Sequence, residues 1–99
     1  MTSETDLIVP ALEVLAGANN GQLPTRQIRE EIKHNIVLSA EDCAPLMNRP
    51  DARIDQKIRN LKSHKKNVGN PIFEGLISEI PRGMSITTKG RNFLKLRKW

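Results

Sequence analysis

Residues 53–66 read RIDQKIRNLKSHKK, a segment with six Lys or Arg side chains, one His and a single carboxylate, Asp55. Of its three aliphatic residues, Ile58 and Leu61 fall within about 40° of Ile54 on a helical wheel at about 100° per residue. The segment is therefore expected to form a helix with one narrow apolar stripe that contacts a core. The rest of its surface is polar or basic.

The net charge of +5 is distributed unevenly along the 99 residues. Residues 1–50 carry 4 Lys or Arg and 7 Asp or Glu, whereas residues 51–99 carry 12 and 4. A basic excess in one half of a chain is typical of proteins that bind a polyanion. Nucleic acid is favoured over an anionic membrane, because no basic segment has a broad apolar face that would lie in lipid.

Length and composition narrow the class of protein further. Ninety-nine residues, 37% of them hydrophobic, predict one globular domain over residues 1–99. The single Cys43 excludes an internal disulfide and a Cys-rich zinc site, and no apolar run approaches the roughly 18 residues of a membrane span. The N-terminal segment lacks the features of a signal peptide. These features predict a cytoplasmic domain without cofactor or metal.

The order of the remaining elements predicts the fold. Helices are expected over about 6–17, 25–35, 51–66 and 88–97, with a very short strand at 22–23 and a β-hairpin at about 76–87. Asp6, Thr25 and Thr87 are placed to cap the first, second and last helices. Residues 37–50 connect the second helix to the third. This order is that of a winged helix-turn-helix, a mostly α domain with a small β-hairpin (α+β).

In that fold the third helix reads the major groove of DNA. On the helical wheel, the polar side opposite the apolar stripe carries side chains suited to base edges, because Arg pairs with guanine and Asn or Gln with adenine. The candidate base-reading residues are Arg53, Gln56, Arg59, Asn60 and Ser63. A solvated basic face is the alternative interpretation of the same pattern, and the order of elements favours DNA.

Further basic residues are candidates for contacts with the DNA backbone or for the wing. Arg82 lies in the predicted turn of the hairpin, at the tip of the wing. Lys89 and Arg91 lie in the first turn of the last helix, where acidic side chains are normally favoured, which indicates an external anionic partner. The full candidate set for backbone and wing contacts is Lys57, Lys62, Lys65, Lys66, Arg82, Lys89 and Arg91.

One short sequence pattern resembles a catalytic motif. Pro50-Asp51 followed by Asp55-x-Lys57 resembles the PD…D-x-K arrangement of metal-dependent nucleases. That chemistry requires two carboxylates and a lysine that converge from neighbouring strands, whereas these acids are predicted on one helix. No metal site is expected. His34 and His64 each end a predicted helix, where a cation suits the helix dipole, and neither shows metal-ligand spacing.

Two stretches, IDQKIRNLKSH (54–64) and GLISEIPRGMSITTKGRNFL (75–94), resemble the N-terminal winged-helix domain of Mrr-type restriction proteins. They are also similar to winged helices joined to nuclease modules in modification-dependent restriction enzymes. The resemblance runs from LPTRQIREEI (23–32) to ITTKGRNFL, and NLKSH and ITTKGR are its characteristic pieces. It implies DNA binding through Arg53, Gln56, Arg59, Asn60, Ser63 and Arg82, and a nuclease domain in cis or trans.

The sequence departs from that family in the segment KKNVGNPIFEG (65–75), which is longer than the usual link between the third helix and the hairpin. We expect its two large apolar residues, Ile72 and Phe73, to pack on the core rather than to form an extra contact loop.

The expected function is that of a non-catalytic, double-stranded DNA-binding domain, the target-recognition module of a restriction endonuclease, present as a monomer or weak dimer. Whether it senses a methylated base stays open. Three alternatives remain. The first is a small transcription regulator, and the second is a protein-interaction module, which predicts an exposed apolar patch. The third is an enzyme based on Asp51, Asp55 and Lys57.

Overall fold

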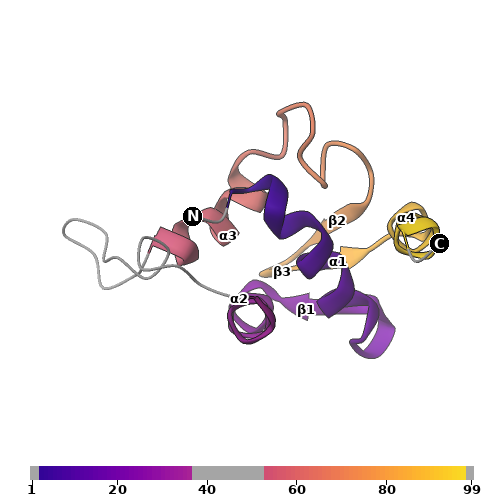
Figure 1. Cartoon of the computed structure of the whole chain (residues 1–99), viewed down its shortest axis with the longest axis horizontal. Coiled ribbons are helices and arrows are strands. Elements are labelled where there is room, and N and C mark those ends of the chain that lie inside the picture. The colour runs from indigo at the N-terminus through magenta and orange to yellow at the C-terminus, as the bar shows by residue number, and fades with distance from the viewer. Residues whose placement is uncertain (1–2, 37–52, 98–99) are drawn as a thin grey trace.

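Four α-helices and a three-stranded antiparallel sheet form the described part of the chain, residues 3–36 and 53–97, in a computed structural model (Figure 1). After short 3-10 turns at Thr5–Leu7 and Asn19–Gly21 are set aside, the elements in chain order are α1 (Ile8–Ala16), β1 (Gln22–Pro24), α2 (Thr25–Asn35), α3 (Arg53–Ser63), β2 (Ile77–Ile80), β3 (Gly83–Ile86) and α4 (Thr88–Arg97). The chain is a compact α+β domain, as predicted. The expected connection at 37–50 and the expected helical positions 51–52, with Cys43 and Asp51, lie outside the described residues.

Ser3 and Asp6 exchange two hydrogen bonds at the 3-10 turn that precedes the first helix, α1. The amide of Ser3 donates to Asp6 Oδ2 at 3.0 Å, and the amide of Asp6 donates to Ser3 Oγ at 3.2 Å. This is the geometry of a capping box, in which each side chain satisfies an amide that the helix leaves without a partner. α1 itself begins after Leu7 without a side-chain cap, so the prediction that Asp6 caps it is wrong.

The second helix has the predicted bounds but begins without a side-chain cap. Pro24 occupies the capping position, so the prediction that Thr25 caps this helix is wrong. The physical reason is a tertiary contact. β1 runs directly into α2 and brings the Thr25 amide within 2.9 Å of the carbonyl of Arg82. The hairpin turn thus supplies the acceptor for the first amide of α2.

The third helix ends at Ser63, three residues before the predicted end at 66. Residues 64–66 form a turn, and the buried Asn70 donates through Nδ2 to the carbonyl of Leu61 at 2.9 Å. Asn70 Oδ1 also accepts the amide of Ile72 at 2.8 Å. This one side chain satisfies a carbonyl in the last turn of α3 and orders the link that follows.

The strands pair in the order β1-β3-β2, with β3 in the centre. The hairpin register places Ile77 opposite Ile86 and Ile80 opposite Gly83. The predicted hairpin and the predicted short strand are both confirmed, and β1 pairs with β3 from Gln22–Ser85 to Pro24–Gly83. The sheet therefore joins the N-terminal helices to the hairpin.

The turn of the hairpin gives its glycine and its arginine unexpected backbone roles. Arg82 adopts a positive φ of 60°, a conformation that glycine tolerates better than other residues. Gly83 follows it and lies against β1, where a side chain would collide with the carbonyl oxygen of Leu23 and approach its carbonyl carbon at 3.0 Å. The glycine of this turn thus lies where β1 approaches closely, and the residue with the positive φ is Arg82.

The hydrophobic core lies between α1, α2, α3 and the sheet, and α1 crosses it beside β3 (Figure 1). The core consists of Leu7, Ala11, Leu12, Leu15, Ile28, Ile32, Ile54, Ile58, Leu61, Leu76, Ile77, Met84, Ile86 and Leu94. At the start of α4, the amide of Gly90 donates to Thr87 Oγ1 at 3.0 Å, so the predicted cap at Thr87 is confirmed.

Gly83→Ala is expected to destabilise the domain by about 1–3 kcal/mol, because the added methyl overlaps the backbone of β1. Gly17→Ala is the matched control, since Gly17 has an ordinary φ of −83° and a methyl there meets nothing closer than 3.6 Å. The control is expected to be neutral or stabilising by about 0.4–1 kcal/mol. Urea unfolding measures both, and equal stability of the two variants would contradict the close approach of β1 to β3.

Candidate nucleic-acid interface

The predicted apolar stripe of α3 is confirmed, because Ile54, Ile58 and Leu61 are fully buried in the core. The opposite side of the helix faces away from the core, and its side chains range from half-buried to exposed. The burial of three residues at helical spacing thus fixes which side chains of α3 are presented outward.

Asp55, beside the apolar stripe, is also buried, with 6% of its surface exposed, which the helical pattern did not predict. Its Oδ1 accepts a hydrogen bond from Lys33 Nζ at 3.1 Å and lies 3.6 Å from Arg29 Nε, both on α2. Arg29 and Lys33 are four residues apart, so they lie on the same face of α2. The ion pairs join α2 to α3 at a buried point.

This arrangement also bears on the nuclease-like pattern. The carboxylate of Asp55 contacts two cations of α2, and Asp51 lies outside the described residues. Among residues 3–36 and 53–97, no group of three His, Cys, Asp or Glu side chains is placed to hold a metal ion.

Three of the five candidate base-reading residues are connected on the outward face of α3. Arg59 Nη2 donates to Gln56 Oε1 at 2.9 Å, and Gln56 Nε2 donates to Asn60 Oδ1 at 2.9 Å. Ser63 Oγ donates to the carbonyl of Arg59 at 3.4 Å, and Arg53 is exposed at the first residue of the helix. We call the connected side chains of Gln56, Arg59 and Asn60 the polar relay.

Two of the candidate phosphate-binding lysines reach from α3 to the hairpin. Lys62 Nζ donates to the carbonyl of Ile80 at 3.4 Å, and Lys65 Nζ donates to Glu79 Oε1 at 2.8 Å. The hydrogen bond from Lys65 is the main cause that lowers the pKa of the Glu79 carboxyl, and the charges of Lys65 and Lys62 add to it. These contacts hold the end of α3 against β2. Lys57 is half-buried on α3, and Lys66 is exposed in the turn that follows.

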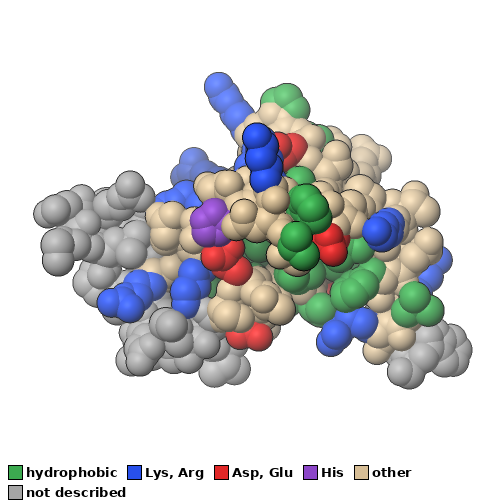
Figure 2. All heavy atoms as spheres, turned by 90° about the horizontal axis from the view of Figure 1, so that it is seen from above, with side chains coloured by type: hydrophobic (Ala, Val, Ile, Leu, Met, Phe, Trp, Pro, Cys, Tyr) green, Lys and Arg blue, Asp and Glu red, His purple; other side chains and the backbone are tan. Residues whose placement is uncertain are grey.

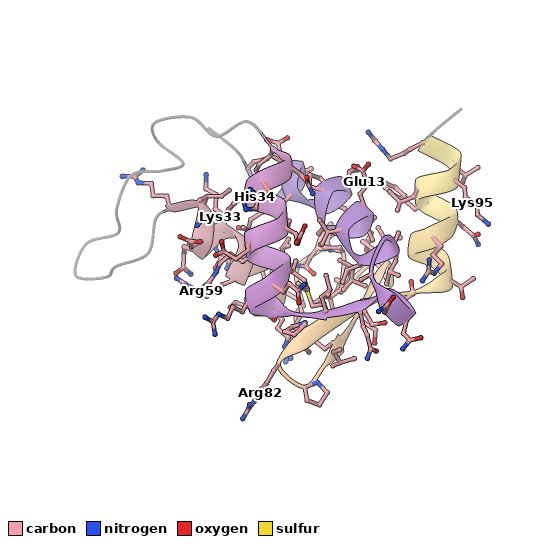
Figure 3. The ribbon with its side chains drawn as sticks, turned by 90° about the horizontal axis from the view of Figure 1, so that it is seen from below. Glu13, Lys33, His34, Arg59, Arg82 and Lys95 are labelled. Carbon is pink, nitrogen blue, oxygen red and sulfur yellow. The ribbon has the colours of Figure 1, made fainter. Side chains whose placement is uncertain are left out.

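Arg82 is exposed at the tip of the hairpin and projects away from it (Figure 3). Arg59 lies on the same side of the molecule, whereas Lys95 lies on α4 at the opposite side (Figure 3). Arg82 and Arg59 therefore both lie on the side of the molecule away from α4.

The structure does not bring Lys89 and Arg91 to that surface. They belong to α4, which lies at the other end of the molecule from α3 (Figure 1). Lys89 Nζ donates to the carbonyl of Glu74 at 2.8 Å, and a Cβ at Gly21 would lie 2.5 Å from Arg91 Nη2. Lys89 therefore has an intramolecular acceptor and Arg91 lies beside Gly21, while both residues are exposed.

The link between α3 and β2 only partly follows its prediction. Ile72 packs against the core as expected, but Phe73 is 50% exposed, so the expectation that it packs inside is wrong. Val68 in the same link is 85% exposed. Figure 2 shows hydrophobic side chains gathered on the face seen from above, with Lys and Arg side chains around them. The turns that Asn70 organises bury Asn70 and Pro71 and leave Val68 and Phe73 exposed.

His64 lies just after the end of α3, and its amide donates to the carbonyl of Asn60 at 2.9 Å. Its Nδ1 lies 2.9 Å from Glu4 Oε1 in the N-terminal segment. The ring thus joins the end of α3 to the start of the chain beside the hollow lined by Thr5, Asn67 and neighbouring residues.

Comparisons of the chain with models of protein families, with curated proteins and with solved structures found no match.

Within the described ranges, no helix is long and apolar enough to span a lipid bilayer.

Asp55→Asn is expected to destabilise the domain by about 1–3 kcal/mol, because it removes a charged acceptor from beside Lys33 and Arg29. Glu30→Gln is the control, since it removes the same charge from an exposed position on α2 and is expected to change stability by less than about 0.5 kcal/mol. Thermal or urea unfolding at pH 7 measures both. A loss in Asp55→Asn no larger than that of the control would show that the ion pairs do not stabilise the fold.

Lys65→Met is expected to raise the pKa of Glu79 toward its ordinary value, because the hydrogen bond and positive charge that lower it are removed. In the unmodified protein the contact exists while Glu79 is ionised and is lost as the pH falls through its lowered pKa. Titration of the Glu79 side chain by carbon NMR measures the change. Lys66→Met, an exposed neighbour, is expected to leave that pKa unchanged, and equal shifts in both variants would refute the specific pairing.

Proposed function

We propose that this chain is a non-catalytic winged helix-turn-helix domain that binds double-stranded DNA. In this proposal α3 enters the major groove and the β2–β3 hairpin is the wing that meets the backbone or minor groove. The observation that carries the proposal is that Arg59, a member of the polar relay, and Arg82 at the hairpin tip both lie on the side of the molecule away from α4 (Figure 3).

The contacts behind α3 support this proposal. A helix that reads bases must be held at a fixed angle, because a small rotation moves every outward side chain. On one side Asp55 joins α3 to Arg29 and Lys33 of α2, and on the other Lys62 and Lys65 join its end to β2. The helix is therefore anchored from two directions while its polar relay stays outward.

The charge around α3 also supports the proposal, since phosphate contacts supply most of the affinity of such domains. The basic residues of α3, the turn after it and the hairpin tip are Arg53, Lys57, Arg59, Lys62, Lys65, Lys66 and Arg82. Lys62 and Lys65 already contact β2, but an ammonium group has three N–H donors, so each can also donate to a phosphate oxygen.

A narrower proposal is that the domain recognises the target of a restriction endonuclease, with a nuclease domain in cis or trans. It is supported by the resemblance of residues 54–64 and 75–94 to the winged helices of Mrr-type proteins. Binding to randomised duplex pools that are unmodified, adenine-methylated or cytosine-methylated tests it. A selected motif or a preferred pool supports recognition of a target, whereas equal binding of all sequences leaves a general DNA-binding domain.

The DNA-binding proposal predicts affinity that falls steeply with salt. Lys62→Ala is expected to weaken binding to all sequences alike and to reduce the slope of log K against log salt by about one unit, because one phosphate contact is lost. Lys95→Ala removes an equal charge from α4 on the opposite side and is the control, expected to keep the slope. Fluorescence anisotropy with a labelled duplex at several salt concentrations measures both. Absence of binding even at low salt would overturn the proposal.

A further inference from the structure

The direction of hydrogen bonding through the polar relay is dictated by chemistry. A guanidinium only donates, so the Gln56 atom that Arg59 contacts at 2.9 Å is the carbonyl oxygen Oε1. The amide nitrogen of Gln56 is thereby turned toward Asn60 and requires an acceptor, which is Asn60 Oδ1 at 2.9 Å. One donor-only group at position 59 therefore orients two amides in succession.

The relay leaves a surface of donors. Asn60 Oδ1 is turned toward Gln56, so its amide nitrogen, with two N–H donors, is directed to the other side. Within the described part of the chain, no acceptor is hydrogen-bonded to that nitrogen. The guanidinium of Arg59 contains N–H donors and no acceptor. Gln56 lies between Arg59 and Asn60: its amide oxygen accepts from Arg59, and its amide nitrogen donates to Asn60.

We propose that α3 reads a base step whose contacted edge offers acceptors, with guanine opposite Arg59 and guanine or thymine opposite Asn60. This inference rests on the proposed DNA binding. In the major groove guanine presents two adjacent acceptors, N7 and O6, and thymine presents O4. Cytosine presents an amino group, and adenine presents its N7 acceptor beside an amino group that would face the second N–H of Asn60. Gln56 is a positioning residue. The residue types by themselves favoured adenine for Asn and Gln, and the relay reverses that assignment for Asn60.

The relay predicts that an exchange at Gln56 changes the base selected by Asn60. In Gln56→Glu the introduced carboxylate still accepts from Arg59 but cannot donate to Asn60. The Asn60 amide then turns its nitrogen inward and its oxygen outward, so the outward group becomes an acceptor. Preference at the position contacted by Asn60 is expected to move from guanine or thymine to adenine or cytosine, while guanine opposite Arg59 is retained.

The experiment is enrichment from a randomised duplex pool, followed by affinity measurement on the selected site and its single-base variants. Asn60→Ala identifies the base position that Asn60 contacts, because only that preference disappears. The unmodified protein is expected to prefer its guanine or thymine there about tenfold over adenine. Gln56→Glu is expected to invert the preference, and Gln56→Met, which has no amide, to abolish it without inversion.

The outcomes separate this inference from the proposed function. Salt-sensitive binding in which Asn60 selects adenine, or in which Gln56→Glu leaves the selected base unchanged, overturns the relay and retains DNA binding. No binding by the unmodified protein at low salt overturns both. A Gln56→Met variant that loses affinity equally on every sequence and keeps its preference would show that Gln56 contacts a phosphate, which also overturns the positioning role.

Discussion

The geometry of the outward face depends on one buried carboxylate. Asp55 comes directly after the core residue Ile54, so it cannot leave the protein interior without rotating α3. Its oxygen contacts two cations of α2, which gives α3 a polar constraint in addition to its apolar stripe. Apolar packing by itself tolerates small rotations of a helix, whereas a charged hydrogen bond is directional. The angle at which α3 presents its polar relay is therefore fixed by a contact on its hidden side.

The sheet supplies the second constraint. The central strand β3 pairs with β1 on one edge and with β2 on the other, and β1 continues without a loop into α2. The hairpin and α2 are consequently parts of one structure, although residues 24 and 83 are far apart in the chain. The lysines at the end of α3 complete this arrangement from the other side, since both reach β2. The helix and the hairpin tip are thus held in a defined relation.

Periodicity in the sequence was sufficient to predict the bounds of α2 and α4, the hairpin and the buried stripe of α3. Its errors have a common physical origin. Thr25 has the residue type of a cap, but the acceptor for its amide comes from Arg82 in the distant hairpin. Phe73 has the residue type of a core residue, yet Asn70 forms turns that leave it half exposed. Both errors depend on hydrogen bonds, one between distant segments and one within the link, and hydrophobic periodicity contains neither.

The candidate site shows the same limit. The wheel placed Gln56, Arg59 and Asn60 on one face, and the structure brings these three within hydrogen-bonding distance of one another. Spacing of three and four residues could have suggested the contacts, but not which atoms face outward. The ion pairs of Asp55 required knowledge of how α2 lies on α3, and the separation of Lys89 and Arg91 from α3 required the position of α4.

The backbone of the hairpin turn has a consequence for how the molecule responds to force. The carbonyl of Arg82 accepts the first amide of α2, and the next residue, Gly83, lies against the backbone of β1. The tip of the hairpin and the start of α2 are therefore coupled, so that one cannot move without the other. A displacement of the tip lengthens the hydrogen bond from the Thr25 amide to the Arg82 carbonyl. A residue inserted between positions 82 and 83 would separate this hydrogen bond from the contact of Gly83 with β1. The length of this turn is therefore constrained by its hydrogen bond to α2, and not only by the partner that the tip contacts.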